Sequence, residues 1–410
     1  GTESHDRYNL TGKISAQVTD YLKIDYSSRY SRVDYSRPTY MTSDFYNHIM
    51  RRARPVRAIA DPNGYLMSDI NYIGAMRDGG RHTDQNDGLS QQLRITLTPL
   101  KNWNIIGEFN IKTDNNWSHE EQLMVYSHYK DNPENTYLAL TSAKNDRVAE
   151  YSYKSTYLNP TVYSNYNFTV DKHNVAVVAG MQLEQMKYRD MSGGRNTLVS
   201  TELPVLNLTT DMENYYLNGQ YQRWANAGFF GRVNYDYDGK YLVEVNFRYD
   251  GSSRFRRENR WVSTPSFSLG WNLARENFWG DWADYVQTFK PRISYGELAN
   301  QNTNSWYPTY QTISVSAGGG SWIQNGVKPN AAWAPGLIST SLTWEKIKSL
   351  NRYQKGVLIF MIAMALVFAV IYPMTISQVG FEYKNTILVP SQEDGSTVYS
   401  GKIQGKQTHF

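Results

Sequence analysis

Hydrophobic and polar residues alternate along residues 228–249, where the sequence reads GFFGRVNYDYDGKYLVEVNFRY. Odd positions hold mostly aromatic and aliphatic side chains, and even positions are mainly charged or carry amides. Successive side chains of a strand face opposite sides, so this pattern predicts two strands, each with one apolar face. Asp238-Gly239 lies between them and predicts a tight primed turn, because glycine adopts the required positive φ at no steric cost.

The same alternation recurs along the chain and predicts an all-β fold of about 12 to 14 antiparallel strands. We expect strands at 7–18, 21–35, 89–99, 102–114, 149–157, 161–171, 174–188, 228–237, 241–249 and 261–271, one ending near 295, and a last one beginning near 341. Short links are expected at Thr19-Asp20, Leu100-Lys101 and residues 171–174. Long polar segments separate the other strands, at 36–87, 115–148, 189–212 and 297–340, with a short helix near 120–129.

This one-sided distribution of long loops is typical of an outer-membrane barrel with short periplasmic turns, whereas a soluble sandwich more often has similar turns at both ends.

Aromatic residues make up 14% of the chain, with 33 Tyr against 14 Phe. Tyrosine is amphipathic and suits a membrane interface or a wet lumen. The absence of cysteine excludes a disulfide framework. A net charge of +4 does not indicate nucleic-acid binding. We therefore predict a partial antiparallel transmembrane β-barrel.

Three motifs in order resemble the SusC/RagA family of TonB-dependent outer-membrane transporters of Bacteroidetes: RYDGSSRF at 248–255, TPSFSLGW at 264–271 and FKPRISYGELANQN at 289–302. LTWEK at 342–346 is a weaker match, and Thr264 and Ala299 depart from the usual phenylalanine and glycine. The motif residues expected to be structural are Asp250, Gly251, Ser252, Ser253, Arg254, Phe255, Pro265, Trp271, Ser294, Tyr295 and Gly296.

The resemblance implies import of oligosaccharides or peptides across the outer membrane. It also implies a SusD-like surface lipoprotein as partner, and energy from TonB–ExbB–ExbD through a plug domain and TonB box. GTESHDRYNL at the N-terminus has no features of a signal peptide, so we expect residues 1–346 to be a barrel fragment whose signal and plug are encoded upstream. Alone it is not expected to form a closed pore, and discrete single-channel conductance in planar bilayers would contradict this.

The C-terminal segment has a different character. VLIFMIAMALVFAVIY at 357–372 carries no charge, and the apolar stretch of about 356–376 is long enough for one membrane-spanning helix. Basic residues precede it, so the positive-inside rule predicts a cytoplasmic N-terminal end. An apolar helix tends to stop a chain at the export channel, which favours the inner membrane rather than the outer membrane. We predict that 347–410 is a transmembrane helix with a polar tail, joined to the barrel at a chimeric junction between Lys346 and Ile347. An apolar helix packed on the barrel is the alternative.

Candidate ligand-binding residues are aromatic side chains of the last long loop, because aromatic faces stack on sugars and peptides. These are Trp306, Tyr307, Tyr310, Trp322 and Trp333. Packing of the loops on one another is the alternative role. The seven histidines show no metal-ligand spacing, and the acidic pairs have no fixed separation, so we expect no metal, cofactor or enzymatic activity. A surface adhesin without transport and a loop-borne glycan hydrolase are the competing hypotheses.

Overall fold

The computed structural model describes residues 3–349, except 53–55, 57, 69, 141–142 and 304. Beyond residue 349 it describes only residues 356, 359, 363, 391–393 and 396–398. The predicted apolar helix at 356–376 thus lies almost wholly outside the described residues and stays a prediction. Among the helices that are described, none has the length and apolar character needed to cross a membrane.

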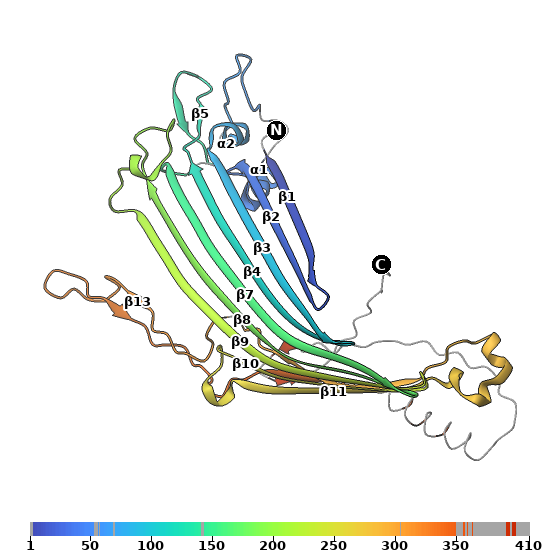
Figure 1. Cartoon of the computed structure of the whole chain (residues 1–410). Coiled ribbons are helices and arrows are strands. Elements are labelled where there is room, and N and C mark those ends of the chain that lie inside the picture. The colour runs from blue at the N-terminus through green and yellow to red at the C-terminus, as the bar shows by residue number, and fades with distance from the viewer. Residues whose placement is uncertain are drawn as a thin grey trace.

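One antiparallel sheet of eleven strands organises the described residues, and neighbours in the sheet follow chain order (Figure 1). Its strands are β1 (Ser4–Thr19), β2 (Leu22–Pro38), β3 (Arg81–Leu100), β4 (Trp103–Gln122), β7 (Arg147–Val170), β8 (His173–Asn196), β9 (Tyr215–Tyr237), β10 (Tyr241–Ser252), β11 (Trp261–Trp271), β12 (Arg292–Asn300) and β15 (Glu345–Ser349). The sheet curves strongly from β1 to β11 (Figure 1). In the described part of the chain β1 pairs only with β2 and β15 only with β12, so the sheet has two open edges.

Smaller elements lie in the connections. They are α1 (Ser43–Arg52), α2 (Tyr72–Asp78), the 3-10 helices η1 (Leu206–Leu208), η2 (Arg257–Asn259), η3 (Leu273–Arg275) and η4 (Asn277–Asp284), and the paired short strands β5 (Tyr126–His128) with β6 (Thr136–Leu138), β13 (Val315–Ser316) with β14 (Ala331–Ala332), and β16 (Ser391–Glu393) with β17 (Ser396–Val398). Two-residue and three-residue turns join β1 to β2, β3 to β4, β7 to β8 and β9 to β10 at one end, here called the short-turn end. The opposite end carries long connections and is called the loop end.

The cross-strand register sorts the side chains onto two faces. Val245 of β10 lies opposite Val233 of β9 and Phe267 of β11, and these three side chains belong to the apolar face. Glu244 lies opposite Asn234 and Ser268 on the polar face. Val245 is 48% exposed although it lies in a central strand. Such a continuous exposed apolar surface needs an apolar environment, which for a barrel wall is lipid.

Several strands are longer than the sequence pattern predicted. β3 begins at Arg81 rather than at 89, and β4 continues to Gln122. The predicted strands 149–157 and 161–171 are one strand, β7, with Pro160 inside it. Pro160 has no N–H, and the pairing of β7 with β8 is interrupted there while the pairing with β4 continues. This merger leaves eleven strands in the main sheet instead of 12 to 14.

The prediction of a helix near 120–129 was wrong, because this segment contains the end of β4 and the short strand β5. The two α-helices instead lie in the segment 36–87, which was predicted to be a loop. Asn71 caps α2, since its side-chain oxygen accepts from the Gly74 N–H at 2.8 Å. Phe45 of α1 packs with Ala75 of α2 and with Val125 in a small hydrophobic cluster at the loop end.

The last strand of the sheet, β15, crosses the predicted junction between Lys346 and Ile347. In its register with β12, Lys348 lies opposite Glu297, and their charged groups are 3.5 Å apart. These residues share a face with Tyr295, which packs against Phe267 of the apolar face. Charged side chains thus enter the apolar face at this edge of the sheet. The division of the chain at residue 346 stays a prediction.

Candidate functional site

Aromatic rings gather on the polar face at the loop end of β7, β8 and β9. The guanidinium carbon of Arg254 lies 5.3 Å from the ring centre of Trp224 and 5.9 Å from that of Trp306. A cation held between two indole faces is attracted by the negative potential above each ring. We call this group, together with the neighbouring rings, the aromatic cluster; its members are Tyr153, Tyr157, Tyr188, Trp224, Arg254 and Trp306.

The strands position the other rings of the aromatic cluster. Tyr157 of β7 lies 6.4 Å from Trp224, and Tyr188 of β8 lies 6.0 Å from Trp306, between ring centres. Tyr188 also stacks on Tyr153, at 5.6 Å and an interplanar angle of 28°. Residues i, i+2 and i+4 of a strand lie on the same face of the sheet. By this spacing the three tyrosines occupy polar-face positions. The rings form a half-buried aromatic surface on a face that is otherwise rich in charges and amides.

A fixed carboxylate lies within the same part of the polar face. Glu184 accepts a hydrogen bond from the Tyr157 hydroxyl at 2.7 Å and one from the Asn226 amide at 3.0 Å. These two donors hold the carboxylate in one orientation. The site therefore offers aromatic faces, one cation and one oriented anion, which are the groups needed to bind sugar hydroxyls or the charged groups of a peptide.

Arg254 is positioned by the DGSSRF motif that follows β10. The Ser253 N–H donates to the Ala225 carbonyl at 2.8 Å, and the Ser253 hydroxyl accepts from the Ala225 N–H at 2.9 Å. Phe255 is 1% exposed and packs 5.6 Å from the ring of Trp344. The motif is thus anchored on both sides of Arg254, to β9 and to the segment before β15.

Burial lowers the pKa of the Arg254 guanidinium from its ordinary value. The side chain stays cationic at neutral pH because an arginine pKa is so high. Its Nε atom is buried and has no hydrogen-bond partner among the described residues. Arg254 was predicted only as a structural motif residue, and its place between two indoles adds a candidate binding role.

The remaining motif residues have structural contacts. Asp250 pairs with Arg248 through two hydrogen bonds of 2.9 and 3.1 Å, and Ser252 is fully buried. A Cβ atom on Gly251 would lie 2.6 Å from the indole of Trp261, so a larger residue would displace that ring. In β11, Pro265 lies beside the point where pairing with β12 ends.

At the other end of β11, Trp271 donates to Glu276 at 3.0 Å. The SYG residues lie in β12: Ser294 opposite Ser268, Tyr295 opposite Phe267 and Gly296 opposite Ser266. These contacts set the packing and the register of β11 against β12.

The five loop aromatics predicted to bind ligand divide into two groups. Trp306 belongs to the aromatic cluster, and Tyr307 next to it donates its hydroxyl to the Arg223 carbonyl and packs edge-on against Tyr310. Trp322 and Trp333 are 65% and 62% exposed. They lie on the segment around β13 and β14, which extends away from the sheet (Figure 1). Among the described ring contacts, none joins these two tryptophans to the aromatic cluster.

Sequence reasoning missed Tyr153, Tyr157, Tyr188, Trp224 and Glu184 as site residues. Their signal is present in the alternation pattern, because aromatic residues at polar-face positions of a barrel strand have no lipid to contact. Recognising them required the exact strand register, since a shift of one residue moves every side chain to the other face.

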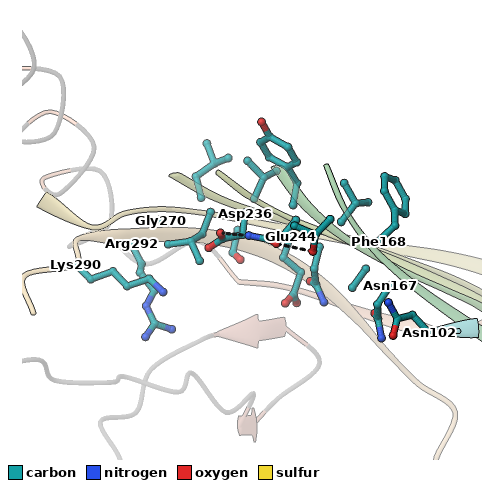
Figure 2. Close-up of a pocket in the computed structure, with 18 residues that line it drawn as sticks. Asn102, Asn167, Phe168, Asp236, Glu244, Gly270, Lys290 and Arg292 are labelled. Carbon is teal, nitrogen blue, oxygen red and sulfur yellow. Dashed lines mark hydrogen bonds between the residues drawn. The ribbon is translucent and has the colours of Figure 1, made fainter. Parts of the chain in front are cut away.

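A hollow with a volume of about 470 Å³ lies at the short-turn end. It is lined by residues of β7 to β12, by Asn102 of the β3–β4 turn and by Lys290 just before β12. Figure 2 shows Lys290 and Arg292 on one side of Asp236, and Asn102 and Asn167 on the other. Asp236 accepts from the Asn174 amide at 3.1 Å. The hollow is open and has both polar and apolar lining residues, and it lies at the opposite end of the sheet from the aromatic cluster.

The long antiparallel strands, the division into an apolar and a polar face, and the long connections at the loop end are typical of the wall of an outer-membrane-type β-barrel. No family model matches the chain. The chain is 31% identical over 193 residues to TonB-dependent receptor P3 of Formosa agariphila, covering 46% of this chain and 18% of that protein. It is 32% identical over 125 residues to TonB-dependent receptor SusC of Bacteroides thetaiotaomicron, covering 30% of this chain and 12% of that protein.

The fold is similar to that of the RagAB peptide importer in its closed-closed state, with a TM-score of 0.64 over 83% of this chain and 37% of that chain, at 15% identity. The chain spans less than a fifth of the length of the two curated relatives, receptor P3 and SusC. The resemblance to SusC/RagA-type TonB-dependent transporters that the motifs predicted is confirmed by these relatives and by the similarity of the fold to RagAB. Its relatives are receptors and transporters rather than enzymes.

Proposed function

We propose that this chain forms part of the wall of an outer-membrane importer, and that the aromatic cluster captures oligosaccharides or peptides on their way into the barrel. The polar face is then the lumenal face, the apolar face contacts lipid, and the loop end faces the cell exterior. The observation that carries the proposal is the position of Arg254 between Trp224 and Trp306 on the polar face, at the loop end.

The chemistry of the aromatic cluster fits both ligand classes. Indole and phenol faces stack on the C–H faces of sugar rings, and Glu184 accepts hydrogen bonds from hydroxyl groups. A peptide offers a carboxylate to Arg254 and a cationic side chain or amino terminus to Glu184. RagAB is named a peptide importer, and SusC is a TonB-dependent receptor, so the relatives do not choose between the two classes.

Import requires partners besides this part of the barrel wall. By similarity to SusC and RagAB, we propose that a SusD-like lipoprotein covers the loop end and that TonB–ExbB–ExbD supplies energy through a plug domain. The alternative is a surface barrel that binds the same ligands without transporting them. The two differ in whether bound ligand reaches the periplasmic side in a TonB-dependent manner.

Ligand capture can be tested on the full chain refolded in phosphatidylcholine vesicles, with tryptophan fluorescence as the readout. Maltohexaose and a mixture of short peptides are titrated separately. Trp224→Ala and Trp306→Ala are each expected to weaken binding of the favoured ligand by about 10- to 100-fold, since each removes one stacking face. Arg254→Gln is expected to weaken binding of a carboxylate-bearing peptide more than binding of maltohexaose.

Trp117→Ala is the matched control, because Trp117 is 62% exposed in β4 on the same side of the sheet as Phe109 of the apolar face. It removes an indole at the loop end but not on the polar face. Equal losses in Trp117→Ala and Trp306→Ala would contradict the proposal. A large loss in Trp322→Ala or Trp333→Ala, with Trp306→Ala unaffected, would move the binding site to the segment around β13 and β14.

A further inference from the structure

Four basic side chains lie on the apolar face just beyond its loop-side border. On β8 this face carries Val175, Val177, Ala179, Met181 and Leu183 in sequence, which is close to the about 9–11 residues of a strand that crosses a bilayer. Gln185 follows, and then Lys187 and Arg189. On β7 Lys154 follows Leu158 and Thr156, and on β9 Arg223 follows Ala227 and Ala225. All four basic side chains are exposed.

The strand register places these cations in two directly opposed pairs. Lys187 of β8 lies opposite Arg223 of β9, and Lys154 of β7 lies opposite Arg189 of β8. Like charges directly opposite each other across a ladder destabilise the sheet. The two pairs are neighbours on the same face, so four positive charges meet with mutual repulsion.

The protein supplies no counter-charge to this group in the part of the chain that the structure describes. None of the ion pairs formed by described residues includes Lys154, Lys187, Arg189 or Arg223. The neighbouring apolar-face positions hold Gln185, Thr156 and Ala225, which are uncharged. An external anion is therefore the natural partner of these cations.

Both borders of the apolar face carry stacked rings. At the short-turn border Tyr237, Tyr241 and Trp271 form a row, with centres 6.1 and 6.3 Å apart, and at the loop-side border Tyr249 stacks on Trp261 at 4.9 Å. Tyrosine and tryptophan at such a border fit the interface of an ordinary bilayer leaflet. Basic clusters beside an apolar surface instead bind anionic lipid headgroups. The basic side chains at the loop-side border thus fit a leaflet with anionic headgroups.

We infer that Lys154, Lys187, Arg189 and Arg223 form a binding site for the phosphate group of an outer-leaflet lipid. Acyl chains of that lipid lie along Leu183 and Phe229 of the apolar face, and its phosphate lies between the two cation pairs. The four residues lie outside the apolar band, and their long side chains can extend back toward the membrane surface. All four charged groups can then reach one headgroup. The inference rests on the proposed orientation, with the loop end outside the cell.

The test compares thermal unfolding of the full chain in two kinds of vesicle: phosphatidylcholine alone, and phosphatidylcholine containing monophosphoryl lipid A. The phosphorylated lipid is expected to raise the unfolding midpoint of the unmodified chain. Lys187→Gln/Arg223→Gln is expected to unfold at a higher temperature than the unmodified chain in phosphatidylcholine, because one repulsive pair is gone. It is also expected to lose most of the lipid-dependent shift, with an affinity for the phosphorylated lipid lower by about 30-fold.

Lys13→Gln/Lys101→Gln is the control, because it removes the same charge from the polar face of β1 and from a short turn. This variant is expected to keep the full lipid-dependent shift. A shift in Lys187→Gln/Arg223→Gln equal to that of the unmodified chain would overturn the inference. So would an equal shift produced by inorganic phosphate in vesicles of phosphatidylcholine, which would indicate a site for a free anion.

The two proposals can fail separately. A chain that binds maltohexaose or peptide through Trp306 but shows no lipid-dependent shift would contradict only the lipid site. A lipid-dependent shift without ligand capture would contradict only the proposed role of the aromatic cluster.

Discussion

The two ends of the sheet are built by different physical rules. At the short-turn end, Asn102, Asp171, Asp238 and Gly239 take positive φ values of 53° to 66°, and three of the four tight connections depend on them. These are residue types that adopt such a conformation easily, so the local sequence is enough to reverse the chain. At the loop end, Phe255 packs against Trp344, and Arg254 against Trp306, across many residues of sequence. Local chemistry fixes one end, and distant contacts fix the other.

The largest effect is expected from a long-range contact at the loop end. Phe255→Ala should lower the free energy of unfolding by about 3–5 kcal/mol, because it empties a fully buried aromatic site against Trp344. Urea unfolding in vesicles measures the loss. Hydrogen exchange should also increase near Thr309, which is buried and whose carbonyl accepts a hydrogen bond from Arg256, the residue after Phe255, at 3.2 Å. Phe267→Ala is the control: Phe267 is 46% exposed on the apolar face, and a much smaller loss is expected. Equal losses would argue against a packed loop end.

Between the two ends, the apolar face can be tested by placing a charge in it. Val245→Arg should cost about 2–4 kcal/mol in a lipid bilayer, as expected for a cation near the middle of a barrel wall. Ser268→Arg is the matched control, because it lies on the polar face opposite Glu244 and gains a favourable partner. The measurement is urea unfolding in phosphatidylcholine vesicles. A greater cost for Ser268→Arg would reverse the assignment of lipid and lumen faces.

At the short-turn end, the Asp238-Gly239 turn offers a smaller effect. Gly239 has φ +66°, and a Cβ atom there would collide with the guanidinium group of Arg275. Gly239→Ala should therefore destabilise the protein by about 1–2 kcal/mol. Gly107→Ala in β4 is the control, because nothing lies within 4 Å of its Cβ position and its φ is not positive. Indistinguishable unfolding curves for the two variants would show that this turn does not need glycine.

The smallest effect concerns the half-buried contacts of Glu276 beside the same turn. Burial opposes ionisation of Glu276, but hydrogen bonds from Trp271, Tyr241 and Lys240, together with the Lys240 charge, lower the pKa of its carboxyl below the ordinary 4.5. The charged carboxylate thus stabilises the folded state above pH 4.5, and this stability is lost as the pH falls through the lowered pKa.

Glu276→Gln should remove this part of the pH dependence and cost no more than about 1 kcal/mol at neutral pH. Unfolding measured between acidic and neutral pH tests both statements. If the stability of the Gln variant rose with pH as steeply as that of the unmodified chain, another carboxyl would be responsible.

Alternation and turn chemistry predicted the fold where structure is local. The Asp238-Gly239 turn was predicted correctly, as were the two strands beside it. Long connections lie mainly at the loop end, but the connection 272–291 between β11 and β12, with η3 and η4, lies at the short-turn end. The strand limits were less well predicted. Two strands were predicted at 149–157 and 161–171, but they are one strand, β7, in which Pro160 is tolerated because only one of its two neighbouring ladders is interrupted. The helices α1 and α2 were missed because they are short and lie within a long segment that was predicted to be a loop, where they pack against each other and against Val125.

The candidate site was predicted only in part, for a related reason. Loop aromatics suggested binding, and Trp306 is in the aromatic cluster, but Trp322 and Trp333 are equally aromatic in sequence and lie elsewhere. Nothing local distinguishes them. Trp306 differs only because Arg254 and Tyr188, from distant parts of the chain, lie next to it.

The sequence by itself determined the strand alternation, the tight turns and the family motifs, because each depends on residues within a few positions of one another. Only the tertiary structure decided which charges and rings become neighbours. Lys187 and Arg223 belong to separate strands, as do Tyr157 and Trp224, and their proximity follows from the β8–β9 register and from the curvature of the sheet. Register is a long-range property, since it depends on every pair along the ladder, and a shift of one residue would exchange the lipid and lumen faces.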